Sequence, residues 1–324
     1  MLYAPQRRSG FTLLELLVVI ALIVLLASLT VGAVFRLVNA RRETNTNTHL
    51  LKIHSQFEQQ YRAGIDTIKK ESVPEAIKQG TKTGAGSVDN ARARALHLKL
   101  RLRQEFPQSF VEADQAKFQV AYPNASSLYP PKRSFSAVSG VNGLSVDDEA
   151  AVLLYLILSQ GRGGATTDVD GIAKTMILPG TNFRVFIDEF GDRPDNPPVI
   201  NHRTYSYANP ISFRRWLDQT DQMSSSDAYN ELANISRDVQ DPDGRLGQGG
   251  TITWEAPANR LAAIDLFVPR AAASGARPNF TVNGANPLDG INRGPLIFSA
   301  GKNGVYMDFD DLLSFRLQQS GKGN

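Results

Sequence analysis

Residues 13–35 form an almost unbroken apolar run, in which the only polar side chains are Glu15, Ser28 and Thr30. A helix rises about 1.5 Å per residue, so a run of this length reaches across a bilayer core of roughly 30 Å. The sequence therefore predicts a membrane anchor over residues 11–36. Glu15 is the anomaly, because an ionised carboxylate near hydrocarbon costs on the order of several kcal/mol unless it finds a partner.

Gly10 and Phe11 stand just before this run, and two arginines precede them. Together with Glu15, they resemble the N-terminal processing segment of type IV pilins and type II secretion pseudopilins. The resemblance implies that a prepilin peptidase removes residues 1–10 as a leader and that the new N-terminal Phe11 is methylated. It also implies that Glu15 pairs with the N-terminal amine of a neighbouring subunit in the growing filament.

The same resemblance sets the expected topology. Arg7 and Arg8 precede the apolar run while Arg36, Arg41 and Arg42 follow it, so basic residues alone do not decide its orientation. The family places the N-terminus in the cytoplasm and the C-terminal domain in the periplasm, on a single-pass inner-membrane protein that enters a filament after processing. An ordinary signal anchor is the alternative. A cleaved secretory signal fits worse, since the run exceeds the usual 7–15 apolar residues.

The net charge limits the kinds of partner that we expect, and the cysteine content limits how the exported part can be stabilised. The formal net charge is +3, and removal of the leader with its two arginines lowers it to +1, which gives little reason to expect nucleic acid as a partner. The chain has no cysteine, so its exported part has no disulfides and must rely on its core or on a metal.

The helix is expected to continue through residues 37–72. Apolar side chains recur there at spacings of three or four, at Leu50, Ile53, Phe57, Tyr61, Ile65 and Ile68, with charged residues between them. Such a stripe indicates a helix with one buried face. We expect it to pack on an antiparallel sheet of the same chain, as in pilins.

Residues 73–180 read as an insertion that contains two helices. The first, over 88–105, carries a basic strip of Arg92, Lys99 and Arg103, which indicates either a phosphate-contacting face or a solvated helix face. Residues 107–143 look mostly irregular. The second helix begins at Ser145, which forms a capping-box pattern with Asp148, ends before Gly161, and is apolar enough to be a buried core helix.

Residues 181–324 are expected to be rich in strands. The strand-like segments are 183–187, 204–207, 251–254, 263–268 and 296–298. Residues 188–192 and 210–213 resemble the two halves of an aspartate, aromatic, glycine and proline stretch of the type II secretion major pseudopilin, separated here by an extra loop. The predicted fold class is α+β: a long N-terminal helix packed on an antiparallel sheet, with a partly helical insertion.

An oxygen-rich loop follows Ser299, and its candidate calcium ligands are Asn303, Asp308, Asp310 and Asp311. Hard oxygen donors crowded into a glycine-containing loop are what Ca²⁺ requires. The segment resembles the calcium loop of the major pseudopilin, although that family usually has aspartate where Asn303 stands. A metal-free loop, in which Asp310 or Asp311 caps the next turn, is the alternative.

The four histidines have no metal-ligand spacing, and no glycine-rich phosphate loop or nucleophile elbow is present. We therefore expect a structural subunit and not an enzyme. Its partners would be its own copies, the prepilin peptidase and the assembly platform in the inner membrane. The competing hypotheses are a minor pilin-like subunit that binds a partner or takes up DNA through the basic strip, and a membrane-anchored exported enzyme.

Overall fold

The structure is a computed structural model. It describes residues 13–80, 88, 90–121, 126–162, 164–165, 168–169, 171–190, 199–200, 203–204, 209–215, 295–301 and 312–314. The chain divides into two compact units, Met1–Asn45 and Thr46–Asn324.

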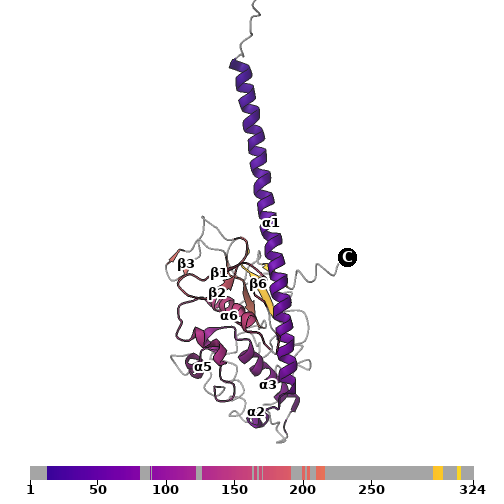
Figure 1. Cartoon of the computed structure of the whole chain (residues 1–324), viewed down its shortest axis with the longest axis vertical. Helices are drawn as coiled ribbons and strands as arrows, with labels where there is room; N and C mark the ends of the chain where they lie inside the picture. Colours follow the sequence, from indigo (N-terminus) through magenta and orange to yellow (C-terminus); the bar gives the residue numbers. More distant parts are fainter. Residues whose placement is uncertain are drawn as a thin grey trace, which may run out of the picture. The chain divides into compact units, whose positions relative to one another are not determined.

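Helix α1, Leu13–Lys70, is the longest described element and is drawn in indigo and purple (Figure 1). Glu15 lies in its first turn and Lys69 and Lys70 in its last, where each charge opposes the end charge of the helix macrodipole. The helix ends shortly before Pro74, and the backbone N–H of Glu71 donates to the carbonyl of Ile68 at 3.0 Å. The predicted long N-terminal helix is confirmed.

The predicted stripe on the second part of α1 is also confirmed. Leu50, Ile53, Phe57, Tyr61 and Ile68 are buried, and Ile65 is partly buried against the same core. The Phe57 ring lies 5.0 Å from that of Phe213 in strand β5, Ser212–Arg214, and 5.5 Å from that of Phe106. This face of the helix therefore packs on both a strand and the end of another helix.

Helix α6, Val146–Gln160, has the ends that the sequence predicts. The backbone N–H of Asp148 donates to Ser145 Oγ at 3.1 Å, and Ser145 Oγ donates to Asp148 Oδ2 at 2.7 Å. Gly161 ends the helix with φ of 70°, a left-handed conformation that favours glycine. Most of its side chains are buried, so α6 is the core helix that we expected.

Helix α3, Asn90–Glu105, matches the helix predicted over 88–105. Helix α2, Glu75–Gly80, precedes it. The segment predicted to be mostly irregular instead contains α4, Phe110–Ala113, α5, Gln115–Ala121, and a 3₁₀ helix η1, Arg133–Val138. Each is too short to show a helical repeat in the sequence, and each is held by one buried aromatic ring, Phe110, Phe118 or Phe135.

The described strands form three small antiparallel sheets. Strand β1, Thr175–Ile177, pairs with β2, Arg184–Phe186, and β3, Val199–Ile200, pairs with β4, Arg203–Thr204. The third sheet has the order β5-β6-β7, in which β6 is Leu296–Ser299 and β7 is Leu312–Leu313. Helix α6 packs against β2 and β5, so the fold is α+β and, over the described residues, mostly helical.

Two of the five predicted strands coincide with β2 and β6, and a third overlaps β4 at Thr204. The segments predicted over 251–254 and 263–268 lie outside the described residues. One buried core contains side chains from α1, α3, α6, β2, β5 and β6. The proposed limits of the insertion, 73–180, and of the strand-rich region, 181–324, stay predictions.

Candidate functional site

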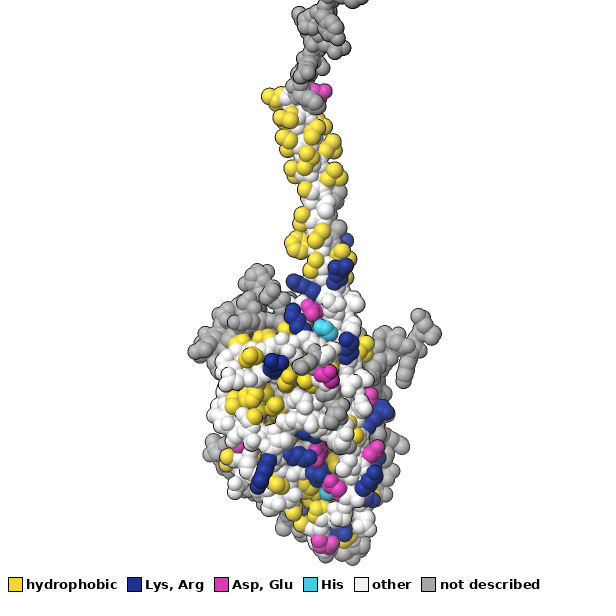
Figure 2. Space-filling view, viewed as in Figure 1, with side chains coloured by type: hydrophobic (Ala, Val, Ile, Leu, Met, Phe, Trp, Pro, Cys, Tyr) yellow, Lys and Arg dark blue, Asp and Glu magenta, His cyan; other side chains and the backbone are white. Residues whose placement is uncertain are grey.

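The first part of α1 carries large apolar side chains whose exposure is high around the whole helix. Figure 2 shows them in yellow along its length, and between Leu13 and Phe35 they range from 45 % exposed at Val19 to 82 % at Leu13. A helix that is apolar all round is normally buried in protein or lipid. This surface is therefore the first candidate for a functional contact.

The polar side chains of the same stretch are accommodated within the helix. Ser28 Oγ donates to the carbonyl of Leu25 and Thr30 Oγ1 to that of Leu26, both at 2.8 Å. Hydroxyls that bond to the preceding turn need no partner from water. Glu15 is exposed in the first turn, where the helix N-terminus favours a negative charge. Gly10 and Phe11, the predicted processing site, lie outside the described residues.

Among the helices of the described residues, none met the length and apolarity required of a membrane span. The predicted span over 11–36 is thus not supported by the described residues.

A second candidate site lies where β2 ends. The carboxylate of Asp188 is fully buried; its Oδ2 accepts from Ser299 Oγ at 2.6 Å and from Asn209 Nδ2 at 3.2 Å. Asn209 Nδ2 also donates to the carbonyl of Gly301 at 3.3 Å, and Asp188 Oδ1 accepts from the Phe190 N–H at 3.1 Å. We call Asp188, Asn209, Ser299 and Gly301 the Asp188 junction.

The Asp188 junction brings together three distant parts of the sequence. The Asp188 N–H donates to the carbonyl of Asn209 at 3.0 Å, and Ile187 forms an isolated bridge with Pro210. The described residues of the split stretch predicted at 188–192 and 210–213, namely 188–190 and 210–213, are thus neighbours in space. The junction also holds Ser299 and Gly301, the first residues of the predicted calcium loop.

Burial moves the titration of the Asp188 carboxyl toward neutral pH. Burial raises the pKa of Asp188 from 3.8 to about 6, and the hydrogen bonds from Ser299, Asn209 and Phe190 oppose this rise without cancelling it. Near pH 7 the carboxyl is therefore mostly ionised, and the hydrogen bonds from Ser299, Asn209 and Phe190 stabilise its charge.

The predicted calcium ligands Asn303, Asp308, Asp310 and Asp311 lie outside the described residues. Ser299 Oγ and the Gly301 carbonyl, at the start of the loop, are bonded to Asp188 and Asn209. Within the described part of the chain, no group of three or more potential ligands from His, Cys, Asp and Glu could hold a metal ion.

The basic strip on α3 does not have the exposure that we expected. Lys99 is 4 % exposed and Arg103 is 3 % exposed, and the Arg103 guanidinium lies 5.1 Å from the centre of the Phe118 ring. The side chain of Arg92 is outside what the structure describes. The expectation of a solvent-facing strip is therefore wrong for Lys99 and Arg103, because these cations are packed inside the domain and cannot reach a phosphate backbone.

His97 is the described histidine with the most developed polar contacts. Its Nδ1 lies 2.7 Å from the Tyr129 hydroxyl, and its Nε2 lies 3.5 Å from Glu71 Oε2. Burial is the main cause that lowers the pKa of His97 and raises that of Tyr129, so both are neutral near pH 7. Both side chains are buried beside a core, which is the usual place of a structural pair.

Comparison with known families bears on the N-terminal segment, where the exposed apolar helix begins. Residues 5–31 match the model of the prokaryotic N-terminal methylation motif. The methylation motif includes Gly10, Phe11 and Glu15, and it supports a type IV pilin-like protein with a processed N-terminal helix. The comparisons with curated proteins and with solved structures found no match for this chain.

Sequence reasoning identified the methylation segment because its signal is contiguous. It included Asp188 only as part of a longer stretch, and it missed Asn209, which links Asp188 to Gly301. The one available signal was the position of Asn209 directly before the second half of the split stretch. Ser299 and Asp188 are separated by 111 residues, so no local pattern could have paired them.

Proposed function

We propose that this chain is a structural pilin-like subunit that assembles into an inner-membrane filament and most resembles the major pseudopilin of type II secretion. The observation that carries the proposal is the methylation motif over residues 5–31, which leads into a helix with exposed apolar side chains. Burying one Leu or Val side chain contributes about 1.5–3 kcal/mol. Withdrawal of this stretch from water is thus a strong driving force for insertion and for packing between subunits.

In this proposal a prepilin peptidase cuts between Gly10 and Phe11, and the Phe11 amine is methylated. The N-terminus lies in the cytoplasm and the domain from Thr46 onward in the periplasm. Glu15 pairs with the N-terminal amine of a neighbouring subunit. In a low-dielectric surrounding an amine and a carboxylate attract strongly, whereas an unpaired carboxylate is costly. Glu15 would therefore select the correct register between subunits.

Assembly of a Glu15→Gln variant tests this function. The full-length protein would be produced with a prepilin peptidase and an assembly platform, and filaments would be isolated by shearing and quantified by immunoblot and electron microscopy. We expect Glu15→Gln to lose most filaments, because the amide cannot neutralise the amine.

Glu43→Gln on the same helix is the matched control and should assemble like the wild type. Thermal melting followed by circular dichroism should show the same folded domain in all three proteins. Normal filament yield from Glu15→Gln would reject the pairing.

We also propose that Ca²⁺ binds the C-terminal loop through Asn303, Asp308, Asp310 and Asp311. The support is the donor set itself, one amide and three carboxylates within a short glycine-containing stretch. The Asp188 junction holds Ser299 and Gly301 at the base of the loop. A bound Ca²⁺ would supply the positive charge that lets these carboxylates lie close together.

Melting temperatures with Ca²⁺ and with a chelator test the proposed metal. We expect the chelator to lower the melting temperature of the wild type and to have no further effect on Asp310→Ala. An unchanged melting temperature in both proteins would reject the calcium site.

A further inference from the structure

A cavity of about 440 Å³ lies at the C-terminal end of α6, beside the start of η1. Lys132, Arg133, Ser134, Gln160, Arg162 and Gly164 are among the residues that line it. Its volume is within the range of about 300–1,000 Å³ that is usual for small-molecule sites. Neither the methylation motif nor the predicted calcium loop contributes to it.

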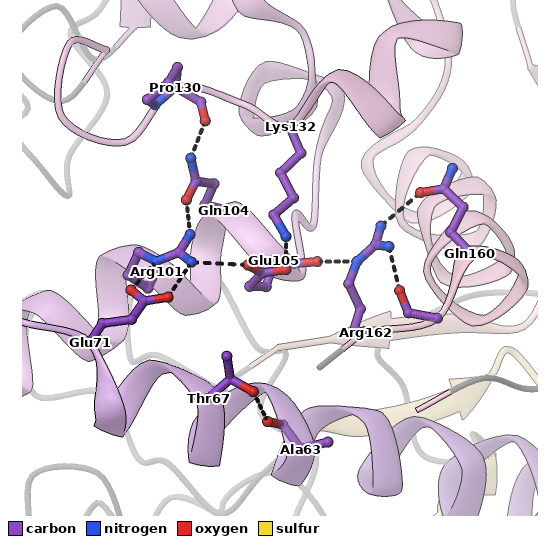
Figure 3. Close-up of polar contacts among 11 residues, drawn as sticks. Ala63, Thr67, Glu71, Arg101, Gln104, Glu105, Pro130, Lys132, Gln160 and Arg162 are labelled. Carbon is purple, nitrogen blue, oxygen red and sulfur yellow. Dashed lines mark hydrogen bonds and ion pairs between the residues drawn. The ribbon is translucent and has the colours of Figure 1, made fainter. Parts of the chain in front are cut away.

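Positively charged residues outnumber negatively charged residues in the lining of the cavity. Lys132, Arg133 and Arg162 are cations, and Glu105 is the one carboxylate among the described lining residues. Glu105 is shared, because Lys132 donates to its Oε2 and Arg101 lies 3.3 Å from its Oε1 (Figure 3). Arg101 in turn has a bidentate contact with Glu71, with both distances 2.7 Å. Glu105 therefore does not balance Arg133 and Arg162.

Arg162 is 6 % exposed and donates to three neutral oxygens. Its Nε donates to the Glu105 carbonyl at 3.0 Å, its Nη1 to the Gly161 carbonyl at 2.7 Å, and its Nη2 to Gln160 Oε1 at 2.9 Å. The guanidinium also lies 4.6 Å from the centre of the Phe135 ring. These contacts, seen in part in Figure 3, fix the plane of the guanidinium before any ligand arrives.

The charge of Arg162 is nevertheless poorly compensated. No carboxylate among the described residues forms an ion pair with it, and burial lowers its pKa to about 10 against the opposing effect of Glu105. A buried cation is costly unless an anion accompanies it. A guanidinium has five N–H groups, and the three contacts above use three of them. Two N–H groups therefore remain for a ligand.

We propose that this cavity binds a small oxyanion, a phosphate or carboxylate group of a soluble compound, through Arg162 with Arg133 and Lys132. The planar fork of a guanidinium matches the paired oxygens of both groups. A Cβ built on Gly164, at φ of +85°, meets no atom within 4 Å, so this part of the wall leaves room for the rest of the ligand. The site is distinct from the filament helix and would give the exported domain a binding role.

Calorimetric titration of the full-length protein in a non-ionic detergent tests the site. Inorganic phosphate and citrate would be titrated separately at constant ionic strength, which distinguishes phosphate from carboxylate recognition. We expect saturable binding of at least one anion at one site per chain. We expect Arg133→Gln and Lys132→Gln each to weaken binding about tenfold or more, since each removes a charge-assisted contact.

Arg184→Gln is the matched control, because Arg184 is exposed on β2, away from the residues that line the cavity, and carries the same charge. It should bind like the wild type. Absence of saturable binding for both anions would overturn the proposal, as would equal affinity in the wild type, Arg133→Gln and Lys132→Gln.

A second variant separates charge from geometry. Arg162→Lys retains the charge and loses the planar fork with its contacts to neighbouring oxygens, so we expect weaker binding and a lower melting temperature. If this variant unfolds, the binding of Arg133→Gln still tests the proposal, because Arg133 is exposed. If Arg162→Lys folds and binds as tightly as the wild type, the planar fork does not recognise the anion and the role proposed for Arg162 fails.

Discussion

Asp188 joins three segments while its own ionisation is opposed by burial. Its pKa rises from 3.8 to about 6 in the folded protein, so between these pH values the folded state binds more protons than the unfolded state. The resulting stabilisation is fully present below pH 4 and is lost as pH rises through 6. At 1.36 kcal/mol per pKa unit it amounts to at most about 3 kcal/mol.

The Asp188→Asn variant should lose this pH dependence, because an amide does not titrate. Denaturant unfolding of the full-length protein between pH 4 and pH 8 would measure it. The difference in unfolding free energy between wild type and variant should change by up to about 3 kcal/mol across the window. Parallel curves for the two proteins would show that Asp188 does not titrate in this range.

Glu112 and Arg215 form a buried ion pair, with Glu112 Oε2 2.8 Å from Arg215 Nη1 and Oε1 3.0 Å from Nη2. Burial acts to raise the pKa of Glu112, but the charge and hydrogen bonds of Arg215, together with the charge of Arg103 and the Gln108 N–H, hold this pKa below its usual value. Glu112→Gln would leave Arg215 with no compensating charge from this position. We expect a loss of about 3–5 kcal/mol of unfolding free energy by denaturant titration.

Glu58→Gln is the control for this prediction. Glu58 Oε1 contacts Arg62 Nη2 at 2.6 Å on the surface of α1, and the Arg62 side chain is 73 % exposed. Such exposed pairs contribute less than about 1 kcal/mol. Equal losses of unfolding free energy in Glu112→Gln and Glu58→Gln would show that burial does not strengthen the Glu112–Arg215 pair.

At the scale of elements, Gly64 lets α1 approach the end of α3. A Cβ at this position would lie 3.0 Å from Phe106 Cε2, and the Phe106 ring is already held 5.5 Å from Phe57 and 5.1 Å from Tyr61. Gly64→Val should therefore destabilise the protein by about 1–3 kcal/mol through overpacking, although valine is the better helix former.

Thermal melting of Gly64→Val beside Ala63→Val would measure this effect. Ala63 is partly exposed and one residue earlier on α1, so its variant should show a smaller loss. A melting temperature for Gly64→Val at or above that of the wild type would mean that Phe106 moves aside freely.

The elements that could be predicted are those whose signals are local. The stripe on α1 and the capping residues of α6 fix both helices within a few residues. The burial of Lys99 and Arg103 could not be predicted, because α3 lies between two cores. Leu98 and Leu102 pack in one core and Leu96 and Leu100 in the other, so no single polar face exists.

The candidate sites also differ in whether their residues are contiguous or far apart in the sequence. The methylation motif is contiguous, and so it could be found from the sequence. The oxyanion cavity depends on Arg162, which bonds to Glu105 across 57 residues, and the Asp188 junction depends on still longer separations. These contacts follow from tertiary packing, which no short pattern encodes.

For the whole molecule, we propose a processed helix that drives assembly and a domain with its own core. The methylation motif and the exposed apolar surface of α1 support the first part. The core that joins α1, α6 and the small sheets supports the second. Loss of assembly in a folded protein is therefore the expected phenotype of changes near Glu15.

The mass of the mature N-terminus shows whether the chain is cut and methylated at Phe11. The protein would be purified from membranes of cells that contain a prepilin peptidase, and its N-terminal peptide would be identified by mass spectrometry. We expect a chain that begins at Phe11 and carries one methyl group on its amine. A chain that retains Met1, or one cut near Ala33, would contradict this expectation.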